Sequence, residues 1–137
     1  SRWRLTVIDP GAPIAVAFAA GNFTASGAMT WTVEAADQVT FKYQQCGKTV
    51  TIWFAIETTT VGGTLDTDLV IAIPGGFVAS SKVANAIFVN DAGTAQAGFV
   101  LVNAAGVTLV CRRITQASWS AATNTTTLIG QITFEVN

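Results

Sequence analysis

Residues 39–60 read VTFKYQQCGKTVTIWFAIETTT, and this stretch decides the fold. Apolar and polar residues alternate in it with a period of two, and the alternation restarts after Gly47-Lys48. Two alternating runs around a glycine-containing break are typical of a β-hairpin with one buried face. The residues expected on the inward face are Val39, Phe41, Tyr43, Gln45, Val50, Ile52, Phe54 and Ile56.

The same alternation recurs outside the hairpin, and no segment of credible length has a helical period. Further strands are expected over residues 29–33, 69–73, 82–89, 95–102, 107–111 and 128–136. Turn-forming sequences separate them, for example at residues 74–76 and 90–93. The pattern predicts an all-β fold, an antiparallel, jelly-roll-like β-sandwich of about eight to nine strands.

The chain is expected to form one main domain over residues 28–137, preceded by an N-terminal arm or connector over residues 1–27. The arm is rich in alanine and glycine and has two short alternating segments, at residues 2–8 and 14–18. Such an arm could pack on a neighbouring subunit. Because the sequence begins at Ser1, without an initiator methionine or a leader, we expect it to be part of a longer protein.

The composition has few charges and many apolar residues. Only 11% of the residues are charged, the mean hydropathy is +0.49 and twenty residues are threonine. Every apolar run is shorter than the ~18 residues that cross a membrane, so membrane insertion is not expected. A domain with so few charges would expose much apolar surface unless a partner covered it, and this favours a homo-oligomer. Residues 69–73, 97–102 and 107–111 are apolar on both faces, which places one face in the core and the other against a subunit or an overlying loop.

Some of these residues are candidates for contacts between subunits, namely Trp31, Trp53, Val100 and Val110. The two valines lie in strands that are apolar on both faces, and Trp53 lies on the threonine side of its strand. An exposed tryptophan beside threonine can seal a subunit interface or stack on the apolar face of a sugar ring. For Trp53 the subunit interface is the favoured alternative.

Residue types exclude several kinds of chemistry. The chain has no histidine, which removes Ser-His-Asp and Cys-His catalysis and the usual zinc sites. A net charge of −1 with scattered cations disfavours nucleic-acid binding, and the Arg112-Arg113 pair is too small to change this. The isolated glycine pairs precede no helical pattern, so no phosphate-binding loop is expected. Neither a cofactor nor a metal ion is expected.

The two cysteines, Cys46 and Cys111, lie within strand patterns, where a cysteine usually acts as a small buried apolar residue. They allow at most one internal disulfide. Whether their Cα atoms come within the ~7 Å that a disulfide needs is a question the sequence leaves open.

Paired carboxylates are the remaining catalytic option, as in glycoside hydrolysis. Glu34 with Asp37, and Asp66 with Asp68, are the pairs that lie close in sequence. All four residues lie in expected turns, where carboxylates commonly cap the backbone or face solvent, so an enzyme is not expected. Asp66 and Asp68 could also supply two oxygen ligands to calcium, although two ligands in a loop are weak evidence for a site.

Ligand contacts are expected on the long polar loops, residues 61–68 and 115–125. The candidate residues are Asp66, Asp68, Trp119 and Asn124. Trp119 lies in a segment rich in serine, threonine and asparagine, where an indole could stack on a sugar while short polar groups bind its hydroxyls. This combination favours a saccharide as the ligand.

The block from Trp31 to Phe77 resembles the distal, receptor-binding domains of bacteriophage tail fibres and related tail proteins, and the resemblance extends over roughly residues 28–137. The residues in matching places are Tyr43, Gly47, Lys48, Val50 and Pro74. The resemblance implies a trimeric β-sandwich at a fibre tip that binds a host surface saccharide or protein. It also implies a place in the virion tail, after synthesis in the host cytoplasm. No binding residue is carried over, because the contacting loops of such domains vary.

The expected function is therefore a non-catalytic, homotrimeric tail receptor-binding domain that engages a host surface glycan. Two alternatives stay open. One is a structural virion module, such as a tail adaptor or a capsid decoration, which binds only virion proteins. The other is an enzyme domain that acts on polysaccharide.

Overall fold

The computed structural model describes residues 11–137, and the strand expected over residues 2–8 lies outside this range. The described strands are β1 (Ile14–Ala15), β2 (Phe23–Ala25), β3 (Met29–Thr32), β4 (Gln38–Cys46), β5 (Thr49–Gly63), β6 (Leu69–Ala72), β7 (Val83–Asp91), β8 (Thr94–Val102), β9 (Thr108–Arg113) and β10 (Ala122–Glu135). Short 3-10 turns lie at Ala20–Asn22, Ala35–Asp37 and Pro74–Gly76. Every strand expected after residue 28 is present, which confirms the all-β prediction.

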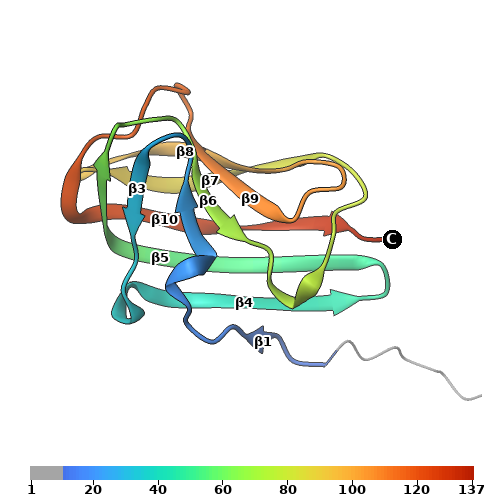
Figure 1. Cartoon of the computed structure of the whole chain (residues 1–137). Helices are drawn as coiled ribbons and strands as arrows, with labels where there is room; N and C mark the ends of the chain where they lie inside the picture. Colours follow the sequence, from blue (N-terminus) through green and yellow to red (C-terminus); the bar gives the residue numbers. More distant parts are fainter. Residues whose placement is uncertain (1–10) are drawn as a thin grey trace, which may run out of the picture.

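The strands pair antiparallel in one continuous, curled sheet (Figure 1). Its order is β1-β4-β5-β10-β7-β8-β9-β6-β2, and β3 pairs with the last residues of β5. The two ends of this order meet across the core. The ring centroid of Phe23 on β2 lies 5.5 Å from that of Trp31 on β3 and 5.9 Å from that of Phe41 on β4. The antiparallel arrangement predicted from the alternation is confirmed.

Strands β4 and β5 form the predicted hairpin, joined by the two-residue turn Gly47-Lys48. Gly47 has a φ of 60°, in the left-handed region that glycine occupies without steric cost. The inward residues of β5 from Val50 to Ile56 are at most 1% exposed, and Phe41 is buried on the neighbouring strand. Each such side chain contributes about 1.5–3 kcal/mol by leaving water, so this face of the hairpin is a large part of the core.

Val39 is predicted to face inward, but its side chain is 61% exposed. The register of β4 on β5 shifts between Gln38 and Thr40, so Val39 is the extra residue of a β-bulge. A bulge interrupts the alternation and turns one residue out of the inward row. The prediction for Val39 is therefore wrong, although the strand itself is correctly placed.

The cysteines differ from each other in burial. Cys46, predicted to be buried, is exposed because it is the last residue of β4, beside the turn and beyond the core. Cys111 is fully buried on β9, and burial, followed by the nearby Asp68 charge, raises the pKa of its thiol. Both are free cysteines, which answers the question of a disulfide between them.

Strand β10 lies in the middle of the sheet and pairs with β5 along most of its length. On its other side it pairs with β7 only over residues 127–129, after which the two strands separate. Asn85 bridges the opening by donating from Nδ2 to the carbonyl oxygen of Gln131, 2.6 Å away. The sheet therefore bends at β10, and its two halves face each other across the core.

The described part of the predicted N-terminal arm belongs to the sheet of its own chain. Strand β1 pairs with β4 at one end of the sheet order, and β2 pairs with β6 at the other end. No helix in residues 11–137 is both long enough and apolar enough to span a membrane.

The side of the sheet that faces away from the core is also apolar, and we call it the outer face. Its residues lie on β6 to β10 and are Val70, Ala84, Ala86, Phe88, Ala97, Phe99, Leu101, Val110 and Ile129. Phe88 is 45% exposed and Ile129 is 38% exposed. Charged residues border this face on the same side of the sheet: Arg112 lies opposite Phe99 and is paired with Asp68, and Glu135 is outward near the end of β10. The inward residues of β6, β8 and β9, namely Leu69 and Ile71, Val100 and Val102, and Leu109 and Cys111, are fully buried, which confirms that these strands have one face in the core. That another subunit covers the outer face stays a prediction.

Candidate functional site

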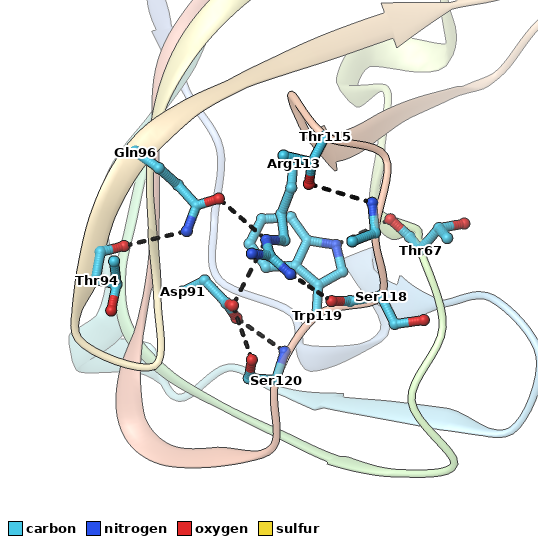
Figure 2. A network of polar contacts seen from close by, with 10 residues as sticks. Thr67, Asp91, Thr94, Gln96, Arg113, Thr115, Ser118, Trp119 and Ser120 are labelled. Carbon is cyan, nitrogen blue, oxygen red and sulfur yellow. Dashed lines mark hydrogen bonds and ion pairs between the residues drawn. The ribbon is translucent and has the colours of Figure 1, made fainter.

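The predicted ligand residue Trp119 is fully buried and forms no exposed stacking surface. Its indole Nε1 donates to the carbonyl oxygen of Thr67, 2.9 Å away, and its backbone N–H donates to the carbonyl oxygen of Asp66, also 2.9 Å away. These bonds join the loop after β5 to the loop before β10 (Figure 2). The saccharide-stacking role predicted for Trp119 is therefore wrong, because the ring lies inside the joint between two loops.

Asp68 forms a two-point ion pair with Arg112. Arg112 Nε lies 2.6 Å from Asp68 Oδ1, and Nη2 lies 3.3 Å from Oδ2. Thr67 Oγ1 donates a further hydrogen bond of 2.8 Å to Oδ1. Burial works to raise the pKa of Asp68, but the hydrogen bonds from Arg112 and Thr67 and the Arg112 charge together hold it below its ordinary value. The predicted ligand carboxylate is thus already engaged within its own chain.

We expect Asp68→Asn to flatten the pH dependence of the free energy of unfolding below about pH 4. Because the pKa of Asp68 is lower in the folded state than in the unfolded state, its carboxylate adds stability above the unfolded pKa. That stability is lost as the pH falls through the folded pKa. The side chains of Arg112 and Asp68 are 31% and 19% exposed, so solvent screens the pair. The expected effect is therefore only about 1 kcal/mol.

Urea unfolding between about pH 2 and pH 6 measures this dependence, a range that spans the ordinary carboxyl pKa. Arg112→Gln should remove the same acid-dependent part of the free energy of unfolding. The double variant Arg112→Gln/Asp68→Asn should then show the same dependence of this free energy on pH as Arg112→Gln alone. If the slope of each single variant equals that of the unaltered chain, the ion pair does not stabilise the fold.

Asp66 and Asn124 also make local contacts. Asp66 Oδ1 accepts a hydrogen bond of 2.8 Å from the backbone N–H of Thr67. Thr60 Oγ1 donates to Asn124 Oδ1 at 3.2 Å and accepts from the Asn124 N–H at 3.0 Å. Asn124 has a φ of 55°, which asparagine tolerates better than most residues, so the backbone accounts for its presence there. Asn124 is hydrogen-bonded to Thr60 on β5. Asp66 is hydrogen-bonded to Thr67 and Trp119, within the two loops that Trp119 joins.

A polar network that sequence reasoning missed surrounds Asp91, a buried residue at the end of β7 (Figure 2). Its carboxylate accepts two hydrogen bonds from Ser120, one from the backbone N–H and one from Oγ, each 2.8 Å long. Arg113 Nε lies 3.6 Å from Asp91 Oδ2. The same arginine donates to Gln96 Oε1 at 3.0 Å and to the Ser118 carbonyl oxygen at 2.7 Å. The network holds the loop before β10 against the β7–β8 hairpin.

The carboxylates considered for catalysis have structural partners. Glu34 and Asp37 form a capping box around a 3-10 turn, in which Asp37 Oδ2 accepts from the Glu34 N–H at 2.9 Å. Thr58 Oγ1 donates to the other Asp37 oxygen at 3.1 Å. Among the residues that the structure describes, no group of three or more cysteine and acidic residues is placed to hold a metal ion.

Two of the four predicted interface residues lie in the core of their own chain. Trp31 is 7% exposed and Val100 is fully buried, so neither can contact another subunit. The prediction for Val100 is wrong by one position, because Leu101 is the outward residue of that pair on β8. Val110 and Trp53 are half-buried on the outward side of the sheet, where an interface residue can lie.

Trp53 forms one wall of an open hollow of about 300 Å³ on the outward side of the sheet. We call it the Trp53 hollow, and its other lining residues are Thr40, Phe54, Ala55, Ile129, Gly130 and Gln131. Ala55 pairs with Thr40 on one side and with Ile129 on the other, so its short side chain leaves the space between them open. Lys42 Nζ lies 5.6 Å from the centroid of the Trp53 ring, a cation–π contact that orients the indole. The hollow is the candidate functional site.

Comparisons with protein-family models, with curated proteins and with solved structures found no match to this chain. What the protein does must therefore follow from its own geometry, chiefly from the outer face and the Trp53 hollow.

Proposed function

We propose that this chain is a non-catalytic, self-associating β-sheet module that works as a homotrimer at the tip of a bacteriophage tail fibre. The observation that supports self-association is the outer face. The chain already has a complete core between the two halves of its curled sheet, yet the opposite side of β6 to β10 carries the apolar residues of the outer face, with Arg112 at their border. An apolar surface of this kind on a soluble protein usually marks a contact with another molecule.

The remaining parts of the proposal have separate support. The tail-fibre assignment follows from the resemblance of residues 31–77 to distal tail domains. The jelly-roll-like sandwich is part of this proposal, and what supports it is that the two halves of the curled sheet face each other across one core. A virion location follows from the same resemblance, and three copies around an axis would cover an apolar side of each subunit.

The mass in solution tests this proposal. Sedimentation or light scattering over a range of concentrations should give three times the chain mass of 14.2 kDa. Because the contact is apolar, the association should persist or strengthen in high salt, in contrast to an association held by exposed ion pairs. A mass of 14.2 kDa at every concentration would contradict the proposal.

A second candidate function, binding of a host surface glycan, is favoured by the Trp53 hollow. A half-exposed indole lies there beside the hydroxyl of Thr40 and the amide of Gln131, which is a combination that can bind a sugar ring. A glycan array probed with the unaltered chain and with Trp53→Ala tests it, and Asn124→Ala is the comparison for the predicted ligand residue near the start of β10. Loss of binding in Trp53→Ala alone would support the hollow. An oligomer that binds no glycan favours the structural virion module, a tail adaptor or capsid decoration.

A further inference from the structure

A large aromatic side chain projects from the outer face beside the Trp53 hollow. Phe88 is 45% exposed, although its backbone lies within the sheet, paired with Ile129 on one side and with Ala97 on the other. Directly opposite residues of antiparallel strands place their side chains on the same face. Phe88 is therefore a projecting ring on a rigid strand rather than on a mobile loop.

The hollow and the projecting ring belong to one row across the sheet. Thr40, Ala55, Ile129 and Phe88 lie opposite one another on the neighbouring strands β4, β5, β10 and β7. Neighbouring strands are about 4.8 Å apart, so the ring lies roughly 10 Å from the floor of the hollow, on the same face. A projection and a recess so placed allow two copies of the same chain to fit each other.

The chemistry of the hollow also favours a second copy of the chain. Its lining is mostly apolar, with Trp53, Ala55 and Ile129 forming the surface that an aromatic ring would contact. Lys42 lies beside the hollow, over the Trp53 ring, whereas Phe88 and the residues paired with it, Ile129 and Ala97, are uncharged. Like charges are therefore not opposed where the ring would enter. Trp53 could receive the edge of a phenyl ring against its indole, a favourable aromatic arrangement.

We propose that Phe88 of one copy inserts into the Trp53 hollow of a neighbouring copy. This inference rests on the proposed self-association and adds to it the residues that make the contact. It also assigns the hollow to a partner chain rather than to a saccharide.

Two variants of the full chain test the contact from its two sides. Phe88→Glu places a charge where the ring enters the hollow, and it should weaken association by about 100-fold or more, as expected for a central interface residue. Ala55→Leu fills the hollow without adding a charge and should have the same effect. The matched control is Val107→Glu, because Val107 is 57% exposed but lies in the loop before β9, outside the row.

The readout is the mass in solution, with circular dichroism to show that each variant keeps its strands. We expect both test variants to give the single-chain mass of 14.2 kDa at concentrations where the unaltered chain and Val107→Glu are oligomeric. Folded Phe88→Glu and Ala55→Leu that remain oligomeric overturn this inference but leave the proposed self-association intact. An unaltered chain that is monomeric overturns both. If Phe88→Glu fails to fold, Ala55→Leu decides, since it adds only apolar atoms on the outward side.

Discussion

Replacing Trp119 by alanine is expected to lower the free energy of unfolding by about 3–5 kcal/mol, the cost of removing a large aromatic side chain from a packed interior. Trp119 is fully buried, and its Nε1 hydrogen bond to Thr67 spans two loops. The alanine would leave a cavity at the joint between these loops. It would also leave the Thr67 carbonyl oxygen without this donor.

Urea unfolding followed by circular dichroism measures the loss, and variants are compared at equal mass in solution because association adds to apparent stability. Trp119→Phe keeps most of the ring and removes the Nε1–H, so it should cost less, about 1–3 kcal/mol. The matched control is Trp53→Ala, which removes a half-buried tryptophan and its contact with Lys42 and should cost about 1 kcal/mol or less. If Trp119→Ala and Trp53→Ala lower the free energy of unfolding equally, the deeper burial of Trp119 does not make it the more stabilising of the two residues.

The sequence predicts the strands well where the alternation is long and a tight turn interrupts it. Strand β5 has 15 residues and β4 has 9, so the hairpin is recognisable even though one residue is misplaced. The misplaced residue, Val39, is turned outward by a bulge directly after the capping box of Glu34 and Asp37. A bulge of this kind depends on how the strand enters the sheet, and the alternation of residue types does not record it.

The loops are harder to predict because their contacts join distant parts of the chain. Trp119 lies in a polar segment, and composition alone places such a residue on the surface. Its indole partner, Thr67, is 52 residues earlier in the sequence, and the Asp91–Ser120 contact spans 29 residues. Such pairings arise when the sheet curls and brings two loops together, so neither segment alone carries a signal for them.

The outer face shows a different limit of sequence reasoning. Strand β8 is apolar on both faces, so its composition correctly predicts one side in the core, and a partner on the other side stays a prediction. It does not show which of two neighbours, Val100 or Leu101, faces the core, because a shift by one residue exchanges the faces without changing the pattern. The register with β7 and β9 decides this, and it turns Val100 inward. The registers of β10 with β7 and with β5 align Phe88 with the Trp53 hollow, which the sequence does not predict.

Replacing Asp91 by alanine is expected to lower the free energy of unfolding by about 2–4 kcal/mol. Asp91 is 5% exposed, and its carboxylate accepts both hydrogen bonds from Ser120 and faces the guanidinium of Arg113. Alanine leaves the Ser120 N–H unpaired and leaves Arg113 without its counter-charge. Because the Arg113 side chain is 21% exposed and keeps its bonds to Gln96 and Ser118, solvent and these partners offset part of the loss.

Three further variants separate the contributions of the network. Asp91→Asn keeps an oxygen that can accept from the Ser120 N–H but removes the charge, so it should cost about half as much as Asp91→Ala, about 1–2 kcal/mol. Ser120→Ala removes only the Oγ hydrogen bond and should cost about 1 kcal/mol. Arg113→Gln combined with Asp91→Ala closes a double-mutant cycle that measures the ion pair directly. A coupling energy near zero would show that Arg113 is held by Gln96 and Ser118 alone, and the stabilising contact would then be the one between Asp91 and Ser120.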